Sequence, residues 1–162
     1  MLLLATKLQE LNFSQLMAVY EDGNRENGEL LFSRFSEEEQ LFLVEQSVYQ
    51  FLNQYFFTLN GAVCAVWIEN GNYVSALRLE PYEDGLLLTS LETAPAQRRK
   101  GYAEQLMRAV QAQFPEKIYS HVSKRNVASL AVHEKCGFRQ VLDYAKYIDG
   151  SVARTAVTLC YR

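Results

Sequence analysis

The segment Arg98–Ala103, RRKGYA, places three cationic side chains and a glycine where a strand is expected to end and a helix to begin. The preceding run Leu86–Leu91 is apolar and typical of a buried strand, and apolar residues then recur at helical spacing up to Phe114. Unpaired N–H groups make a helix start electropositive, so cations there are unfavourable unless an anion binds. Gly101 would let the backbone approach such an anion closely. The segment therefore predicts a phosphate site, although a basic turn on its own is equally compatible with a solvated surface.

A second informative segment, Asn126–Phe138, has the sequence NVASLAVHEKCGF and predicts a helix that ends at Gly137. The two segments together resemble the signatures of the GCN5-related N-acetyltransferase (GNAT) family. The first signature is Arg or Gln, two residues, Gly, one residue, then Gly or Ala, and it is matched by Arg98, Gly101 and Ala103. The second signature is matched by Asn126, Ser129, Lys135, Gly137 and Phe138, with His133 at the position where Tyr is usual. Two signatures in this order are far more specific than either one alone.

The resemblance covers Leu86–Val141 by motif and nearly the whole chain by the order of expected elements. It implies an α/β (α+β) fold, in which a central, mostly antiparallel mixed sheet of about seven strands is flanked by about four helices. The residue patterns themselves predict a hairpin of strands 62–68 and 73–79, joined by the Asn-Gly turn signal at 70–71. This hairpin and the strand before the basic turn would form a meander that continues into a crossover ending at 118–122.

The remaining pattern predicts elements near both ends of the chain. Asn12 is a good N-cap for an amphipathic helix, and Ser36 opens a capping box before a longer, aromatic-rich helix. Between these helices, glycine and asparagine predict a polar loop at 23–28. A first strand is expected at Leu2–Thr6, and the final strands on either side of Asp149–Gly150.

Length and composition favour a single domain spanning residues 1–162, because a hydrophobic content of 49% can fill a sizeable core. The net charge of -3 and the isoelectric point near 5.5 argue against nonspecific nucleic-acid binding. Cys64, Cys136 and Cys160 fit no zinc spacing and are expected to be buried free thiols. The opening run MLLLATKLQE is too short for a signal peptide, and no stretch is long enough to span a membrane. We therefore expect a cytoplasmic protein without membrane association.

The resemblance implies acetyl-CoA as the acyl donor and assigns residues to its binding. A diphosphate needs several N–H donors, which the backbone of a helix start supplies without a side chain for each oxygen. Carried over by position, the residues around the pyrophosphate would be Arg98, Arg99, Lys100, Gly101, Tyr102, Ala103 and Glu104. Backbone groups of Leu91, Glu92 and Thr93 would meet the pantetheine arm and the thioester carbonyl, where an N–H group stabilises the developing oxyanion. Asn126 would hold the pantetheine arm or the helix start.

Direct transfer to an amine needs a base that removes the ammonium proton and an acid that protonates the departing thiolate. The resemblance puts His133 at the position of the acid Tyr of many relatives, and His121 where the N-terminal-amine branch often places a base Glu. Histidine titrates near neutral pH, so both are candidate catalytic residues. Each has a structural alternative, since His121 could hydrogen-bond at a strand end and His133 could pack against the coenzyme. Glu92 is a weaker candidate base, and two histidines are too few to suggest a metal site.

The implied function is an acetyl-CoA-dependent N-acetyltransferase that passes the acetyl group directly to a primary amine of a small molecule. Two alternatives stay open: acetylation of a protein or peptide at its N-terminus or at lysine, and a non-catalytic acyl-CoA sensor. The motifs GxGxxG, GxxxxGK[ST] and GxSxG are absent, which disfavours a nucleotide oxidoreductase, a P-loop NTPase and a serine hydrolase. Aromatic residues that could line an acceptor groove are Phe51, Tyr55, Tyr144 and Tyr147. The sequence allows either a monomer or a homodimer.

Overall fold

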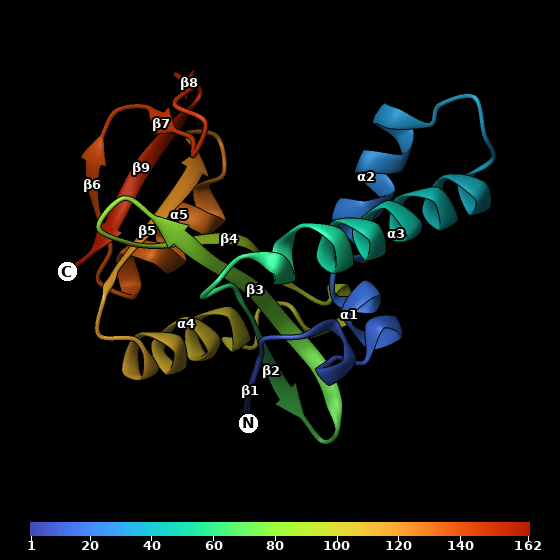
Figure 1. The fold of residues 1–162 in the computed structure, drawn as a ribbon, viewed down its shortest axis with the longest axis horizontal. Coiled ribbons are helices and arrows are strands. Elements are labelled where there is room, and N and C mark those ends of the chain that lie inside the picture. Colours follow the sequence, from blue (N-terminus) through green and yellow to red (C-terminus); the bar gives the residue numbers. More distant parts are fainter.

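The centre of the molecule is a seven-stranded sheet in the computed structural model, which describes residues 1–162. In spatial order its strands are β1 (Leu2–Ala5), β2 (Val63–Glu69), β3 (Asn72–Tyr82), β4 (Gly85–Thr93), β5 (Lys117–Ser123), β9 (Ala156–Tyr161) and β6 (Arg139–Leu142). Only β4 and β5 run parallel, and every other neighbouring pair is antiparallel (Figure 1). A separate two-stranded ribbon is formed by β7 (Ala145–Lys146) and β8 (Val152–Ala153).

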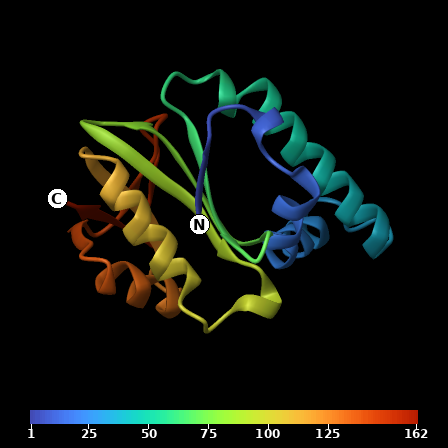
Figure 2. The ribbon, with the colours of Figure 1, turned by 90° about the horizontal axis from the view of Figure 1, so that it is seen from below.

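Five α-helices cover the two faces of the sheet. They are α1 (Phe13–Val19), α2 (Glu21–Leu31), α3 (Glu37–Gln54), α4 (Tyr102–Gln113) and α5 (Val127–Lys135). Figures 1 and 2 show α4 and α5 on one face and α1, α2 and α3 on the other. Short 3-10 helices lie at Leu8–Glu10, Phe56–Thr58 and Pro95–Gln97. This architecture confirms the predicted fold class, a mixed and mostly antiparallel sheet flanked by helices.

Two hydrophobic clusters, one on each face of the sheet, hold these layers together. Successive side chains of β2 point to opposite faces, so Val63 and Ala65 join the cluster that contains α4 residues. Cys64 and Val66 join the cluster that contains residues of α1 and α3. A strand buried on both faces has a continuous apolar sequence, which is the pattern of β2.

The helix caps and the hairpin turn that the sequence predicted are present in the structure. The Asn12 side chain accepts a hydrogen bond from the first turn of α1 at 3.0 Å, and Ser36 and Glu39 form the capping box of α3. Asn70 and Gly71 have φ values of +50° and +79°, as a two-residue hairpin turn with positive φ at both positions requires. These residues confirm the expected starts of α1 and α3 and the expected β2–β3 hairpin.

The three cysteines are buried free thiols, as the sequence predicted. Burial raises the pKa of the Cys64 thiol to about 12, so this side chain is protonated and inert at neutral pH. None of the helices has both the length and the apolar composition needed to cross a bilayer.

Residues 23–28 form part of a helix, and the prediction of a polar loop there was wrong. Helix α2 runs unbroken through this segment, because its glycines are sites of close packing rather than of turns. A Cβ atom on Gly28 would lie 3.0 Å from the Cβ atom of Gln40 on α3. Asn24 is only 5% exposed and donates a hydrogen bond to a side chain of α1. Tertiary contacts thus override the low helix propensity of glycine and asparagine, which accounts for the additional helix.

The parallel pair β4–β5 separates halfway along its length. Pairing extends from Gly85 opposite Lys117 to Leu88 opposite Ser120 and stops there. Immediately beyond, Ser90 has a φ of +53°, and the register between β3 and β4 shifts. Such a bulge bends a strand and redirects its side chains. The second half of β4 therefore leaves β5, and one edge of its backbone is unpaired.

Candidate active site

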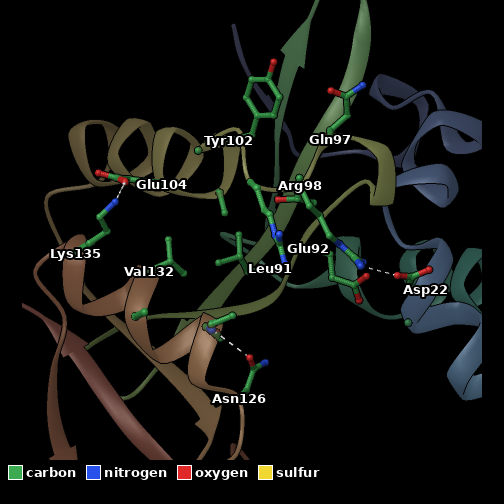
Figure 3. Close-up of a pocket in the computed structure, with 18 of the residues that line it drawn as sticks. Asp22, Leu91, Glu92, Gln97, Arg98, Tyr102, Glu104, Asn126, Val132 and Lys135 are labelled. Atoms are coloured by element: carbon green, nitrogen blue, oxygen red, sulfur yellow. Dashed lines mark hydrogen bonds and ion pairs between the residues drawn. The ribbon is translucent and has the colours of Figure 1, made fainter.

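A cleft of about 790 Å³ opens where β4 leaves β5, between α4, α5 and the N-terminal part of α2 (Figure 3). Strand β4 and the turn that follows it contribute Leu91, Glu92, Thr93, Gln97, Arg98, Arg99 and Gly101. The helices contribute Asp22, Gly23, Glu26, Tyr102, Ala103, Glu104, Asn126, Ala128, Ser129, Ala131, Val132 and Lys135. Three helix starts, those of α2, α4 and α5, and an unpaired strand edge therefore surround one space.

The start of α4 has no side-chain cap. Its N-cap residue Gly101 has a φ of +79°, and Arg99 has a φ of +62°, so the turn uses left-handed backbone twice. The acidic residue of the first turn, Glu104, binds Arg108 and Lys135 at 3.0 and 3.1 Å. Arg99 lines the cleft and belongs to none of the ion pairs. Free N–H groups and an unpaired guanidinium group make this end of the cleft suitable for an anion.

Arg98 reaches across to α2, with 2.7 Å between its Nη1 atom and Oδ2 of Asp22 (Figure 3). The two side chains are 48% and 44% exposed, and an ion pair of this kind contributes at most about 1 kcal/mol. A ligand phosphate can therefore replace Asp22 as the partner of Arg98 at little energetic cost.

Glu92 places a partly buried carboxyl group on the wall of the cleft, on the side of α2 (Figure 3). Burial raises the pKa of this carboxyl, while Arg98 and the backbone N–H of Gly23 oppose the shift. The Glu92 backbone is also held, because its carbonyl oxygen accepts a hydrogen bond from the Ser75 hydroxyl at 2.8 Å. A partly buried carboxyl group with a raised pKa is suited to accept a proton.

A second cavity, of about 320 Å³, adjoins the cleft at Gly23 and Glu92, which line both. It lies between α2, α3, β3 and β4. Its other lining residues are Tyr20, Asn24, Asn27, Leu31, Phe32, Val44, Ser47, Val48, Phe51, Arg78 and Ser90. The Glu92 carboxyl group therefore lies at the boundary between two adjoining spaces.

His133 is buried under the sheet, with 1% of its surface exposed. Its Nδ1 atom lies 2.7 Å from the Ser129 carbonyl oxygen, and its Nε2 atom lies 2.9 Å from the Ser120 hydroxyl. Because a carbonyl can only accept, this network places the proton on Nδ1 and lets Nε2 accept from Ser120. Burial lowers the pKa of His133, and the Ser129 carbonyl opposes the shift. His133 is thus a neutral histidine that does not line the cleft.

His121 lies on the opposite face of β5 from Ser120 and hence from His133, because successive residues of a strand alternate. Its ring packs edge-on against Tyr82 and Tyr147, with centroid distances of 5.5 and 5.3 Å. The buried Nε2 atom has no hydrogen-bond partner, and burial lowers the pKa of the ring. His121 lines neither the cleft nor the second cavity, so the structure does not bring the two histidines together.

The sequence of residues 17–138, which is most of the chain, matches the family model of the Acetyltransferase (GNAT) family. The chain belongs to the GNAT family. This assignment makes the protein an acetyltransferase and confirms the resemblance seen in the two sequence signatures. No curated protein matches the chain in sequence.

Solved structures related to this GNAT protein share its fold over the whole chain. The PaiA N-acetyltransferase of Thermoplasma acidophilum, in complex with coenzyme A, is 11% identical, with a TM-score of 0.64 over 100% of this chain and 99% of that one. A GNAT acetyltransferase of Bacillus cereus is 16% identical, with a TM-score of 0.60 over 100% and 97% of the two chains. The IAA acetyltransferase of Bacillus cereus is also 16% identical, with a TM-score of 0.57 over 99% and 98%. Identities this low show a shared fold.

In this GNAT protein, the residues predicted to bind coenzyme A surround the cleft, with one exception. The Lys100 ammonium group donates a hydrogen bond to Gln97 at 2.9 Å, and Lys100 does not line the cleft. Asn126 caps α5, because its Oδ1 atom accepts from the Ser129 N–H at 3.1 Å. Contacts of all these residues with the coenzyme stay predictions.

Sequence reasoning missed the contribution of α2, whose Asp22, Gly23 and Glu26 line the cleft. The available signal was the acidic pair at the start of the segment, since acidic residues favour the first turn of a helix. Of the four aromatic residues expected in an acceptor groove, Phe51 lines the second cavity. Tyr55 packs on the Phe51 ring instead, at a centroid distance of 5.5 Å, and Tyr147 packs on His121. Tyr144 lines neither the cleft nor the second cavity.

Proposed function

We propose that this GNAT protein, acting as a single domain, transfers the acetyl group of acetyl-CoA directly to a primary amine of a small molecule. The observation that carries the proposal is the position of Glu92, between a cleft whose α4 start is suited to an anion and a second cavity. The complex of the Thermoplasma acidophilum protein with coenzyme A supports the same donor here. The size of the second cavity, about 320 Å³, suits a small acceptor.

Acetyl-CoA would occupy the cleft, with its diphosphate at the start of α4. Arg99 and the backbone around Gly101 would bind the phosphate oxygens. The pantetheine arm would run along Leu91–Thr93, where β4 has no β5 partner and its edge can hydrogen-bond to amide groups. This placement would bring the thioester close to Glu92.

The transfer then needs one proton acceptor and one proton donor. Glu92 would take a proton from the ammonium group of the acceptor, which frees the nitrogen lone pair to attack the thioester carbonyl. The new N–C bond forms, the C–S bond breaks, and the thiolate leaves with the electron pair. The nitrogen then still carries one extra proton, and the transfer of this proton to the thiolate completes the reaction. His133 is neutral, so it would act as the predicted acid only after taking up a proton, and only through Ser129, which lines the cleft and whose hydroxyl lies 3.3 Å from Nδ1. His121 has no comparable path, so we favour Glu92 over His121 as the base.

Release of free CoA thiol from acetyl-CoA, measured over a library of amino acids, polyamines, aminoglycosides and short peptides, tests this function. Acceptor-dependent release by the wild type and a loss of kcat in Glu92→Gln are expected. His133→Ala and His121→Ala, assayed in parallel, test the predicted roles of the histidines. Preferred turnover of peptides would favour a protein acetyltransferase, and tight CoA binding without any turnover would contradict the proposal and favour a sensor.

A further inference from the structure

Arg78 on β3 is a half-buried cation without an acidic partner. Its guanidinium group lies over the rings of Phe51 and Phe56, 4.9 and 5.7 Å from their centroids. One of its nitrogens donates a hydrogen bond of 2.7 Å to the Ser90 hydroxyl. None of the ion pairs of the protein includes it. Burying a charge is unfavourable unless it is paired, and the aromatic rings offset only part of that cost.

The acidic residue that follows Arg78 on the same face of β3 is Glu80, two residues further along. Burial raises the pKa of the Glu80 carboxyl, and Arg78 opposes that shift without cancelling it. The two side chains form no ion pair, so the protein itself does not neutralise Arg78 by direct contact. A bound ligand with an anionic group would neutralise the charge of Arg78.

The guanidinium group has five N–H donors in one plane. With one of them directed to Ser90, others stay available, and this planar fork matches the two oxygens of a carboxylate. Arg78 and Ser90 both line the second cavity, together with the polar side chains of Asn27 and Ser47. The volume of about 320 Å³ is near the lower end of ligand pockets and suits a molecule of few atoms.

The second cavity therefore presents two opposite charges, the Arg78 guanidinium group and the Glu92 carboxyl group. Glu92 also borders the cleft, so the amine to be acetylated would lie on the Glu92 side and an anion on the Arg78 side. Building on the proposed function, we infer that the acceptor is an amino acid-type molecule whose carboxylate binds Arg78 while its amine is acetylated beside Glu92. Polyamines and aminoglycosides are disfavoured, because the guanidinium group repels additional positive charges.

Matched acceptors test this inference. Each of the common L-amino acids, β-alanine and γ-aminobutyrate is compared with its primary amide in steady-state CoA-release assays. The carboxylate form is expected to have the higher kcat/KM with the wild type. Arg78→Gln should raise KM for the carboxylate acceptors by about 10- to 100-fold, the usual effect of losing hydrogen bonds to a charged group, and should change KM for the amides little. Arg78→Lys keeps the positive charge but lacks the planar guanidinium group, so its KM for the carboxylate acceptors should lie between those of the wild type and Arg78→Gln.

Arg34→Gln is the matched control, because it removes the same charge from an exposed arginine that lines neither cavity. Calorimetric titration with CoA shows whether each variant keeps its donor site, and circular dichroism shows whether it folds. Titration of the CoA-bound protein with the same carboxylate acceptors measures their binding even if no turnover occurs.

The outcomes separate this inference from the proposed function. Efficient turnover of amides or polyamines, with carboxylate acceptors rejected, would overturn the role of Arg78 and leave the acetyltransferase function intact. Binding of carboxylate amines that depends on Arg78, without turnover of any acceptor, would support the recognition site and contradict the proposed catalysis. If no carboxylate amine binds or reacts, the inference is wrong.

Discussion

The carboxylate of Glu92 occupies the space into which a side chain at Gly23 would project. Gly23 lies in the first turn of α2. Burial raises the pKa of the Glu92 carboxyl group, and the backbone N–H of Gly23 opposes that shift. Position 23 therefore controls where the proposed base lies, although it carries no functional group of its own.

Gly23→Ala should move the Glu92 carboxylate and lower kcat by about 10- to 100-fold, since small displacements of a catalytic group can have effects of this size. The dissociation constant of CoA should change little. Gly28→Ala is the matched control on the same helix, because its Cβ atom would meet Gln40 of α3 and neither cavity. Gly28→Ala should change the free energy of unfolding and leave kcat close to the wild-type value. Equal kcat values for Gly23→Ala and the wild type would contradict the role of Gly23 in positioning Glu92.

Glu92→Gln should remove the acidic limb of the pH–rate profile. Because burial raises the pKa of Glu92, the wild-type kcat/KM should fall as the pH decreases through a value above the ordinary pKa of glutamate. The same shift affects stability, because the folded state disfavours the ionised carboxyl. Glu92→Gln should therefore raise the thermal midpoint at neutral pH, and this difference should vanish below the ordinary pKa. A wild-type profile that Glu92→Gln reproduces would exclude Glu92 as the base.

Arg99→Ala should weaken CoA binding by about tenfold or more, as expected for losing a hydrogen bond to a phosphate. The loss should shrink at high salt, because salt screens the interaction. Calorimetric titrations at two ionic strengths measure both effects. Arg139→Ala removes an exposed arginine from β6, outside the cleft, and should bind CoA like the wild type. Unchanged affinity in Arg99→Ala would place the diphosphate elsewhere.

His133→Ala should destabilise the fold by about 3 kcal/mol, because it creates a cavity and leaves the Ser120 hydroxyl without its buried partner. The lowered pKa of His133 also predicts acid sensitivity. As the pH falls below the ordinary histidine pKa, the unfolded chain binds the proton first, so stability declines until the lowered folded-state pKa is reached. Denaturant titrations between pH 5 and 8 check this decline, which should be smaller in His133→Gln.

His121→Phe should stabilise the protein by about 1 kcal/mol, because it removes a buried nitrogen that has no hydrogen-bond partner. The ring contacts with Tyr82 and Tyr147 would be kept. Thermal unfolding measures the stability, and CoA release measures the activity. A more stable variant with wild-type kcat would assign His121 a structural role, whereas loss of kcat at unchanged CoA affinity would support the predicted base.

Features set by local interactions could be predicted from the sequence. The cap at Asn12, the capping box at Ser36 and the hairpin turn at 70–71 depend on neighbouring residues alone, and all three are present. The start of α4 is likewise encoded by Gly101 and the basic turn before it. These local signals, with the two family signatures, were sufficient for the fold class.

Features set by distant contacts could not be predicted. Helix α2 contains two glycines and two asparagines, and it forms because Gly23 packs on β4 and Gly28 packs on α3. His133 matches a catalytic position in sequence, but it is buried beside Ser120 of β5 and does not line the cleft. Nothing near Arg78 in the sequence indicates that Phe51 and Ser90 surround it.

The division of the interior into two clusters has an evolutionary consequence. Helix α4, which carries the proposed donor site, packs into the cluster on one face of the sheet, while α1 and α3 pack into the cluster on the other. The second cavity is lined by Tyr20 and Val48 of the cluster that contains α1 and α3 residues and by no residue of the other cluster, so substitutions that reshape it should leave the α4 cluster nearly intact. A lineage with this architecture can change the amine that it modifies while it conserves the coenzyme.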